Sequence, residues 1–171
     1  MKRLLSIIGA ISLVGTSTTS LVACNKTHEY TPEELAKLKE ENKINTKDQT
    51  VRDNLEWIAP QEKPFNEVDN KWYYVVWKKN DKWEIIKTLR NYNIEVGKEY
   101  SIYKDDNYEL KFFKYPNKDA SLFYYSKSPS VFREWKKTNS NYFKSVYRWN
   151  LDTKEPDLII DNNGNIKVNG E

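Results

Sequence analysis

The chain has 171 residues, of which 28 are Lys or Arg and 25 are Asp or Glu, so its formal net charge is +3 at pH 7. Basic and acidic residues are interleaved along the sequence, so the composition does not indicate a protein that binds nucleic acid. The single Cys and single His exclude a disulfide framework and a histidine-based zinc site. Aromatic residues make up 14% of the chain, enough large apolar side chains for one hydrophobic core.

The N-terminal segment has the order of a lipoprotein signal peptide. Lys2 and Arg3 are followed by an apolar segment over residues 4–14, a polar Thr/Ser stretch and then Leu21-Val22-Ala23-Cys24. An apolar residue, a small residue and a Cys form a lipobox, in which the thiol is acylated and the chain is cleaved before the Cys. We therefore expect a signal peptide over residues 1–23.

Two alternatives for this segment are weaker. The apolar segment is about half of the roughly 20 residues that a membrane-spanning helix needs, which disfavours an uncleaved transmembrane helix. An ordinary signal peptide would leave Cys24 without a role, although it is the only Cys of the chain and lies where acylation requires it. Cys24 with a diacylglyceryl group and palmitate is the expected lipidation site, because two acyl chains hold a protein on a membrane and one holds it only marginally.

The residues Met1 to Leu13, the Thr/Ser run and Leu21-Val22-Ala23-Cys24-Asn25-Lys26 resemble the leader of surface lipoproteins from wall-less mollicutes, the spiroplasma type in particular. The frequent Lys, Asn, Tyr and Ile of the remaining chain are similar to theirs in composition only. The resemblance implies that the protein is held on the extracellular face of the cell membrane. It implies no catalytic residue and no cofactor.

Residues 24–55 are expected to form the acylated Cys, a polar tether and a helix. Thr31-Pro32-Glu33-Glu34 has the pattern of a capping box with Pro at the first helical position, which predicts a helix from Pro32 to about Asn42. Its few apolar residues favour a mostly solvated helix that holds the domain off the membrane, and a coiled-coil partner helix would need more heptads. A second short helix is predicted over Val51 to Ile58.

Residues 56–171 are expected to form an antiparallel β-rich domain. The segment Trp72–Trp77 is apolar on both faces, which predicts a central strand or one covered on both sides. Lys79-Asn80-Asp81 offers a turn before the alternating segment 83–89, so these segments should form a hairpin. Further strands are predicted over residues 99–103, 108–112, 121–126 and 142–149, with Glu109 and Lys111 on a wet face and with Phe143, Tyr147 and Trp149 on one face.

The C-terminal part contains one ambiguous segment and one clear hairpin. Residues 131–137 favour a short helix, with a strand left open as the alternative. Asn163-Gly164 between two apolar segments is typical of a type I′ hairpin turn, in which both central residues need positive φ. These elements give an α+β, mainly β fold class: a tether helix followed by a β-rich domain that is an open sheet, a small sandwich or a barrel.

No motif with catalytic or metal-binding chemistry stands out. His28 lies in the expected tether, where a catalytic His would have no shaped pocket around it. Asp161, Asn163 and Asn165 alternate like the start of a calcium loop, but Gly164 falls two positions early for an EF-hand, so they indicate a turn. The five Gly are scattered and form no phosphate-binding loop. We predict no cofactor and no metal.

The aromatic residues are the one feature that points to a function. Six Trp and twelve Tyr could stack on sugar rings or form interface hot spots, although most should fill the core. Tyr73 and Trp77, on the doubly apolar strand, are the candidate binding surface. We therefore expect a lipid-anchored extracellular binding module whose partners are the membrane, through Cys24, and a glycan or a host or partner protein. The alternatives are a surface hydrolase with unassigned carboxylates and a structural coat protein.

Overall fold

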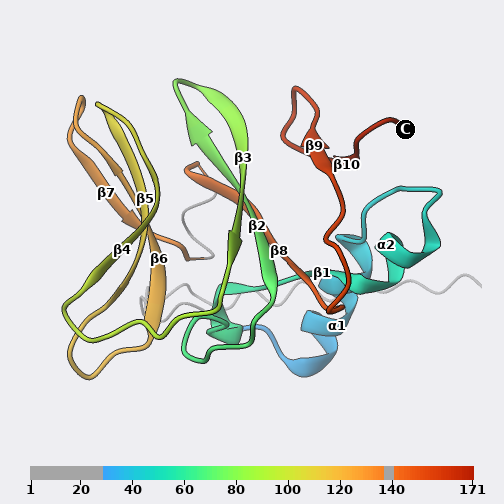
Figure 1. The fold of residues 1–171 in the computed structure, drawn as a ribbon, viewed down its shortest axis with the longest axis horizontal. Helices are drawn as coiled ribbons and strands as arrows, with labels where there is room; N and C mark the ends of the chain where they lie inside the picture. The colour runs from blue at the N-terminus through green and yellow to red at the C-terminus, as the bar shows by residue number, and fades with distance from the viewer. Residues whose placement is uncertain (1–28, 137–140) are drawn as a thin grey trace, which may run out of the picture.

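The computed structural model describes residues 29–136 and 141–171 and contains two open antiparallel sheets that pack face to face (Figure 1). The strand orders are β1-β8-β2-β3 and β4-β5-β6-β7, and β9 and β10 form a separate hairpin. In chain order the elements are α1 (Pro32–Glu41), α2 (Gln49–Asn54), β1 (Leu55–Trp57), η1 (Pro60–Glu62), β2 (Trp72–Lys79), β3 (Lys82–Leu89), β4 (Glu99–Lys104), β5 (Tyr108–Lys114), β6 (Ala120–Ser126), β7 (Val131–Glu134), β8 (Phe143–Trp149), β9 (Leu158–Ile160) and β10 (Ile166–Val168). The predicted fold class is confirmed, and the β domain is the small sandwich.

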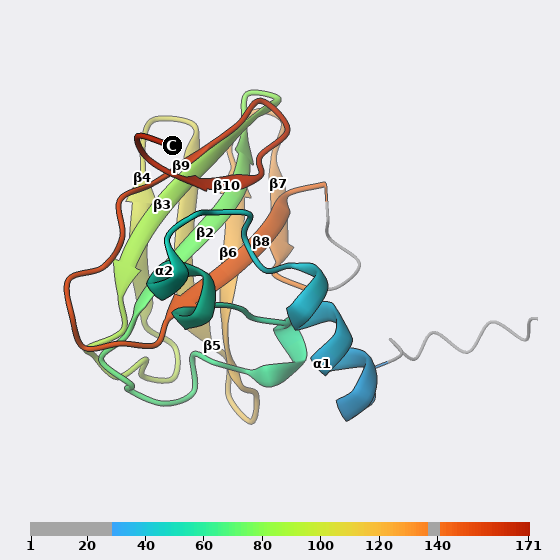
Figure 2. The same ribbon diagram turned by 90° about the vertical axis from the view of Figure 1, so that its right-hand side faces the viewer.

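Strand β2 lies between β8 and β3 and is covered on both faces, as its sequence predicts. Tyr73, Val75 and Trp77 face the second sheet and contribute to the core between the sheets. Tyr74 and Val76 face a second core, which α2 and the C-terminal hairpin cover (Figure 2). The domain therefore has three layers.

The β2–β3 hairpin is also confirmed, and its turn is the tight one. Lys79 pairs with Lys82, so only Asn80 and Asp81 lie between the strands. Both have positive φ, 47° and 60°. Positive φ at both central residues defines a type I′ turn, and Asn and Asp tolerate the left-handed region better than other non-glycine residues.

One prediction about β8 is wrong because the strand contains a bulge. Val76 pairs with Ser145 but Trp77 pairs with Phe143, so Lys144 is the extra residue. The extra residue reverses the alternation of side chains. Phe143 therefore joins the core between the sheets, whereas Tyr147 and Trp149 lie in the other core.

Three further segments differ from the sequence-based expectation. The second helix ends at Asn54, and the chain continues as β1, which pairs with β8. Residues Val131–Glu134 form the edge strand β7, the alternative left open for that segment. The C-terminal hairpin forms, but of its Asn-Gly pair only Gly164 has positive φ, 75°, so its turn is not type I′. Asp161 N–H bonds to the carbonyl of Asn165, which leaves a three-residue loop.

Helix α1 begins with the predicted capping box at Thr31 and has no fully buried residue. Side-chain contacts nevertheless hold the helix against the domain. Lys39 Nζ bonds to a carboxylate of Glu56 on β1 and, at 2.5 Å, to Glu62 on η1. The hydroxyl of Tyr147 donates to the carbonyl of Asn42 just after the helix, at 2.8 Å. The helix is thus part of the domain surface. No helix in the described ranges has the length and apolar content needed to cross a membrane.

Candidate binding surface

The structure places the two predicted surface residues in the core. Tyr73 and Trp77 are 0% and 1% exposed. The ring of Tyr73 packs against Phe65, with centroids 5.4 Å apart, and that of Trp77 packs against Tyr103 at 5.0 Å. The prediction that these side chains form a binding surface is wrong, because the second sheet covers the face of β2 that the sequence left unpartnered.

The predicted lipidation segment lies outside the described residues. This applies to Leu21, Val22, Ala23 and Cys24 and also to His28. The first described contacts to the domain come from Tyr30, whose backbone N–H donates to Oε1 of Gln61 at 2.7 Å. The Gln61 side-chain amide donates in return to the Tyr30 carbonyl at 2.9 Å. The chain therefore joins the domain surface at Tyr30.

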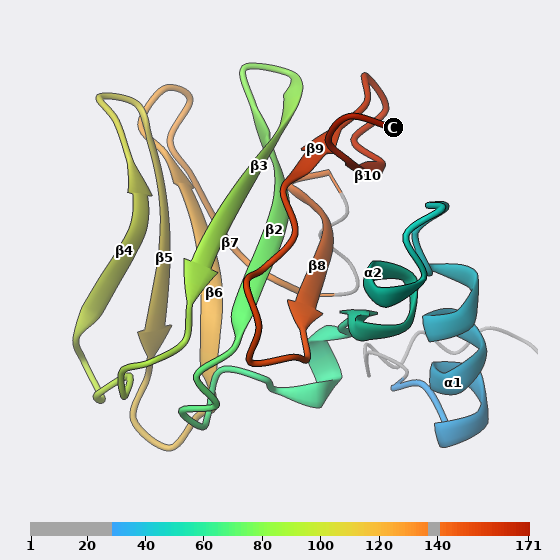
Figure 3. The same cartoon turned by 45° about the vertical axis from the view of Figure 1, so that its right-hand side comes forward.

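Four aromatic side chains lie instead on the outer face of the sheet formed by β4 to β7, and two of them are exposed. Phe113, Tyr115, Phe123 and Phe132 form this outer aromatic surface, in which Phe123 and Phe132 stack at 5.1 Å with an interplanar angle of 13°. Tyr115 contacts Phe113 edge-on at 4.6 Å. Phe132 is 43% exposed and Tyr115 is 40% exposed. Among the described elements none packs over this face (Figure 3).

Ion pairs occupy the rest of the same face. Lys111 Nζ lies 2.6 Å from Glu99 and 3.6 Å from Glu109, and Lys104 lies 3.7 Å from Glu109. Burial lowers the pKa of Lys111, but its bonds to the two carboxylates outweigh burial and raise the pKa above its usual value. Glu109 and Lys111 are each only 9% exposed, so the prediction of a wet face is wrong here. Neighbouring side chains and opposite charges cover them.

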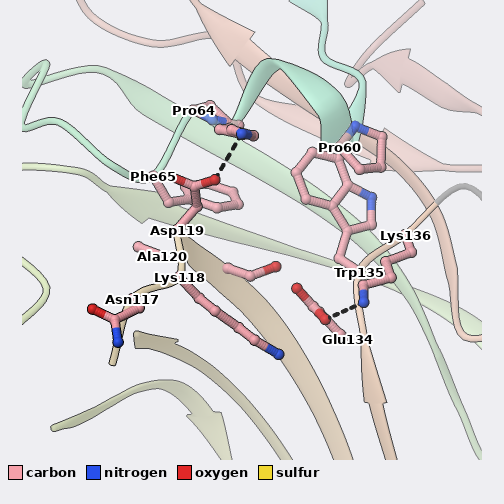
Figure 4. A pocket seen from close by; sticks show the side chains of 12 residues that line it. Pro60, Pro64, Phe65, Asn117, Lys118, Asp119, Ala120, Glu134, Trp135 and Lys136 are labelled. Carbon is pink, nitrogen blue, oxygen red and sulfur yellow. Dashed lines mark ion pairs between the residues drawn. The ribbon is translucent and has the colours of Figure 1, made fainter. Parts of the chain in front are cut away.

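A pocket of about 390 Å³ opens at the edge of the outer aromatic surface (Figure 4). It is formed by the segment around η1, the loop before β6 and the end of β7, and its lining residues include Pro60, Phe65, Asn117, Lys118, Asp119, Ser121, Glu134, Trp135 and Lys136. Glu134 pairs with Phe123 across the strands, and Ser121 pairs with Phe113. Lys118 Nζ lies 5.7 Å from the centre of the Tyr115 ring. The pocket and the outer aromatic surface are therefore continuous.

Both acidic residues of the pocket lie in ion pairs. Lys63 Nζ lies 2.8 Å from Asp119, and Lys136 Nζ lies 2.6 Å from Glu134. The hydrogen bond from Lys63 lowers the pKa of Asp119, and the same contact raises the pKa of Lys63. Both groups are thus stabilised in their charged forms, the opposite of what a general acid at neutral pH requires. The arrangement favours binding over acid–base chemistry.

Asp161, which the sequence indicates as a turn residue, stabilises a turn in the structure, and Asp105 stabilises another. Asp161 accepts backbone N–H groups of Asn163 and Asn165 at 2.8 and 2.9 Å. Asp105 accepts the backbone N–H of Asn107 at 2.9 Å and that of Tyr108 at 2.7 Å, and it pairs with Lys79, whose hydrogen bond lowers the pKa of Asp105. In the described ranges, His, Cys, Asp and Glu side chains form no group of three or more that could hold a metal ion.

Comparisons with known proteins found no matching family model, no matching curated protein and no matching solved structure.

The outer aromatic surface was not predicted from the sequence, although Phe113 and Phe123 gave a signal. Each follows an apolar residue that faces the core, so both strands place an aromatic ring on the outer face. Strand β5 also carries Glu109 and Lys111 there, whereas β6 has large apolar residues on both faces. That pattern predicts a strand covered on both sides, and only the fold shows that the second face has no covering layer.

Proposed function

We propose that this protein is a lipid-anchored surface protein, acylated at Cys24 and held on the extracellular face of the cell membrane, whose sandwich domain binds a partner through the outer aromatic surface. The observation that carries the proposal is the position of Phe132 and Tyr115, exposed on a sheet face with no covering layer among the described elements. Large aromatic side chains exposed together are characteristic of interaction sites.

The place where the chain joins the domain supports a binding surface that faces away from the membrane. Six peptide units separate Cys24 from Tyr30, and six extended units reach at most about 20 Å. The Tyr30–Gln61 bonds and the Lys39 ion pairs fix the chain to the domain from that point. Helix α1 and the sheet of β4 to β7 lie on opposite sides of the sheet that contains β2 (Figure 3). A lipid at Cys24 would therefore hold the α1 end near the bilayer and direct the outer aromatic surface away from it.

The chemistry of the surface favours a partner that offers an apolar, flat area with a charged border. Phe132 and Tyr115 supply exposed apolar contact, Phe113 and Phe123 pack against them, and the ion pairs around Lys111 and in the pocket supply the polar border. A protein surface or a glycan fits this description. Anchoring many copies on one membrane raises their effective concentration, so weak individual contacts can give firm attachment.

Lipidation is tested by growing cells with labelled palmitate and comparing the wild-type chain with Cys24→Ser. We expect label and membrane association only in the wild type. Unlabelled wild-type protein would remove the anchor from the proposal.

Partner binding is tested with the fragment that starts after Cys24, on a glycan array and in pull-downs from host membranes. The informative variant is Phe132→Ser, and its matched control is Ile159→Ser, because Ile159 has nearly the same exposure, 42%, on strand β9. We expect Phe132→Ser to reduce capture and Ile159→Ser to leave it unchanged. Equal capture by both variants would mean that the outer aromatic surface is not the binding site.

A further inference from the structure

A second cavity lies between the two sheets, at the end where the β2–β3 hairpin turns. It has a volume of about 600 Å³, and the residues from both sheets that line it include Lys78, Asn80, Asp81, Tyr108, Tyr124 and Tyr142. We call it the tyrosine cleft. Pockets that hold small molecules range from roughly 300 to 1,000 Å³. The cleft is therefore large enough for a small ligand, and it is separate from the outer aromatic surface.

Three tyrosine rings form one wall of the tyrosine cleft. Tyr124 lies between the other two, 6.1 Å from the ring of Tyr108 and 5.0 Å from that of Tyr142. Trp77 supports Tyr108 and Tyr124 from the core, at 6.2 and 6.1 Å. Because Tyr124 is 6% exposed and Trp77 is 1% exposed, this wall is fixed by the packing of the core. The rings offer apolar faces together with phenolic hydroxyl groups.

The opposite edge of the tyrosine cleft is polar, and the type I′ turn between β2 and β3 forms it. The hydroxyl of Tyr108 donates to Oδ1 of Asn80 at 2.8 Å, which orients the Asn80 amide. The Asp81 side chain is 99% exposed, and its carboxylate lies 3.5 Å from Lys78 Nζ. Among the described lining residues, Lys78 supplies one cation and Asp81 one anion, and their charges cancel. The rim offers amide, carboxylate and ammonium groups without a net charge.

We propose that the tyrosine cleft binds a neutral saccharide of one or two rings. A sugar ring has an apolar C–H face that packs on aromatic rings and a rim of hydroxyl groups that both donate and accept hydrogen bonds. The cleft supplies both complements, in Tyr108, Tyr124 and Tyr142 and in Asn80 and Asp81. A phosphorylated or carboxylated ligand would need an excess of cations, whereas the single Lys78 already has Asp81 as its partner. An entirely apolar ligand would desolvate Asn80 and Asp81 without replacing their hydrogen bonds with water.

This site goes beyond the proposed function, since it requires neither the lipid anchor nor the outer aromatic surface. Titration calorimetry and saturation-transfer NMR on the full chain in detergent micelles test it with four neutral probes and one anionic probe. The neutral probes are cellobiose, lactose, maltose and N,N′-diacetylchitobiose, and the anionic probe is glucose 6-phosphate. We expect at least one neutral probe to bind at millimolar concentration or below, and more tightly than glucose 6-phosphate.

Two variants place the sugar in the tyrosine cleft. Tyr142→Ala removes part of the aromatic wall, and Asp81→Asn removes the carboxylate while keeping a residue that tolerates positive φ at this turn. Each should weaken binding by about tenfold or more, which corresponds to about 1.4 kcal/mol. Asp81 is fully exposed, so Asp81→Asn remains informative even if Tyr142→Ala destabilises the fold. The control, Tyr115→Ala, changes an exposed Tyr of the outer aromatic surface and should leave saccharide affinity within about twofold, or about 0.4 kcal/mol.

The proposal is overturned by any of three results. These are no binding of any neutral probe, unchanged affinity in a folded Asp81→Asn protein, and tighter binding of glucose 6-phosphate than of the neutral sugars. Weaker saccharide binding in Tyr115→Ala with unchanged binding in Asp81→Asn would also overturn it, because the sugar would then occupy the outer aromatic surface. Failure of host-membrane capture with normal saccharide binding would reject the proposed function alone.

Discussion

Gly164 lies against the indole ring of Trp83, and a Cβ atom at position 164 would be 2.6 Å from Cγ of that ring. The contact joins the turn of the C-terminal hairpin to strand β3. Gly164 also has a φ of +75°, which L side chains rarely adopt. Position 164 therefore requires glycine for two reasons, the backbone conformation and the close approach of Trp83.

Gly164→Ala should destabilise the domain more than Gly97→Ala. Gly97 has nearly the same φ, +78°, but a Cβ atom at position 97 would have no other atom within 4 Å. Left-handed backbone costs an Ala about 1–2 kcal/mol at either site. The clash at Trp83 adds overpacking, which typically costs about another 1–3 kcal/mol. Urea unfolding of both variants measures the difference, and equal midpoints would show that Trp83 moves aside freely.

The buried tyrosine at the base of α1 should make the fold sensitive to alkaline pH. Tyr147 is 7% exposed, and burial raises its pKa to about 12. An unfolded chain loses this proton near pH 10, so the folded state binds the proton more tightly between pH 10 and 12. The resulting stability is complete below pH 10 and is lost as the pH rises toward 12. The loss attributable to Tyr147 is about 2–3 kcal/mol.

Tyr147→Phe provides the matching measurement. The variant lacks the hydrogen bond to the Asn42 carbonyl, so it should lose about 1 kcal/mol at neutral pH. Its stability should then fall less steeply than that of the wild type between pH 10 and 12. Parallel pH profiles of the free energy of unfolding would contradict the assignment of the raised pKa to Tyr147.

Arg90 should not be replaceable by Lys. Its guanidinium is 0% exposed and donates to three carbonyl groups, those of Phe65, Glu67 and Tyr92, at 3.1, 3.3 and 2.6 Å. A Lys side chain ends in a single ammonium group and lacks the planar guanidinium, so it cannot donate to all three carbonyl groups in this geometry. Each buried carbonyl left without a donor costs roughly 1–3 kcal/mol. We expect Arg90→Lys to lower the melting temperature clearly and the exposed control Arg133→Lys to leave it nearly unchanged; similar shifts would refute the structural role.

The strands could be predicted from the sequence more reliably than the turns and the faces. Alternation and apolar content located β2, β3 and β5, because burial follows the side-chain period of two. The type I′ turn was expected at Asn163-Gly164 and occurs at Asn80-Asp81. At the C-terminal turn, the Asp161 carboxylate binds the backbone of Asn163 and Asn165 and stabilises a longer loop, which the dipeptide pattern does not reveal.

The candidate site was less predictable because it depends on how the layers stack. Trp77 and Phe123 both lie on strands that carry large apolar residues on both faces. The strand of Trp77 is covered by the second sheet on one side and by α2 and the hairpin on the other, whereas the outer face of β6, the strand of Phe123, has no layer over it among the described elements. Side-chain pattern alone cannot distinguish these two environments. The bulge at Lys144 similarly reverses the face of Phe143 without a signal in the alternation.

Lys39 should control whether α1 stays on the domain. Its ammonium lies between the carboxylates of Glu56 and Glu62, and burial lowers its pKa less than these two bonds raise it. Replacing Lys39 with Met leaves Glu62 without this partner, which should weaken the attachment of α1 by about 1 kcal/mol. Lys37→Met is the matched control, since Lys37 is 76% exposed and pairs with Glu41 at 3.6 Å, on the same helix.

Hydrogen exchange of the α1 amides distinguishes the two variants. Lys39→Met should speed exchange in α1 several-fold while leaving exchange in β2 unchanged, and Lys37→Met should change neither. Acid should have a similar effect in the wild type: the pKa of Glu56 is lowered by its bonds to Lys39 and Asn150 despite burial, so its contribution is present above the ordinary Glu pKa and is lost as the pH falls through the lowered value. If the protein is anchored at Cys24 as proposed, release of α1 would lengthen the connection between the lipid and the domain by about 1.5–3.5 Å for each freed residue. Unchanged exchange in Lys39→Met would mean that the Tyr147 and Gln61 contacts hold α1 without the ion pairs.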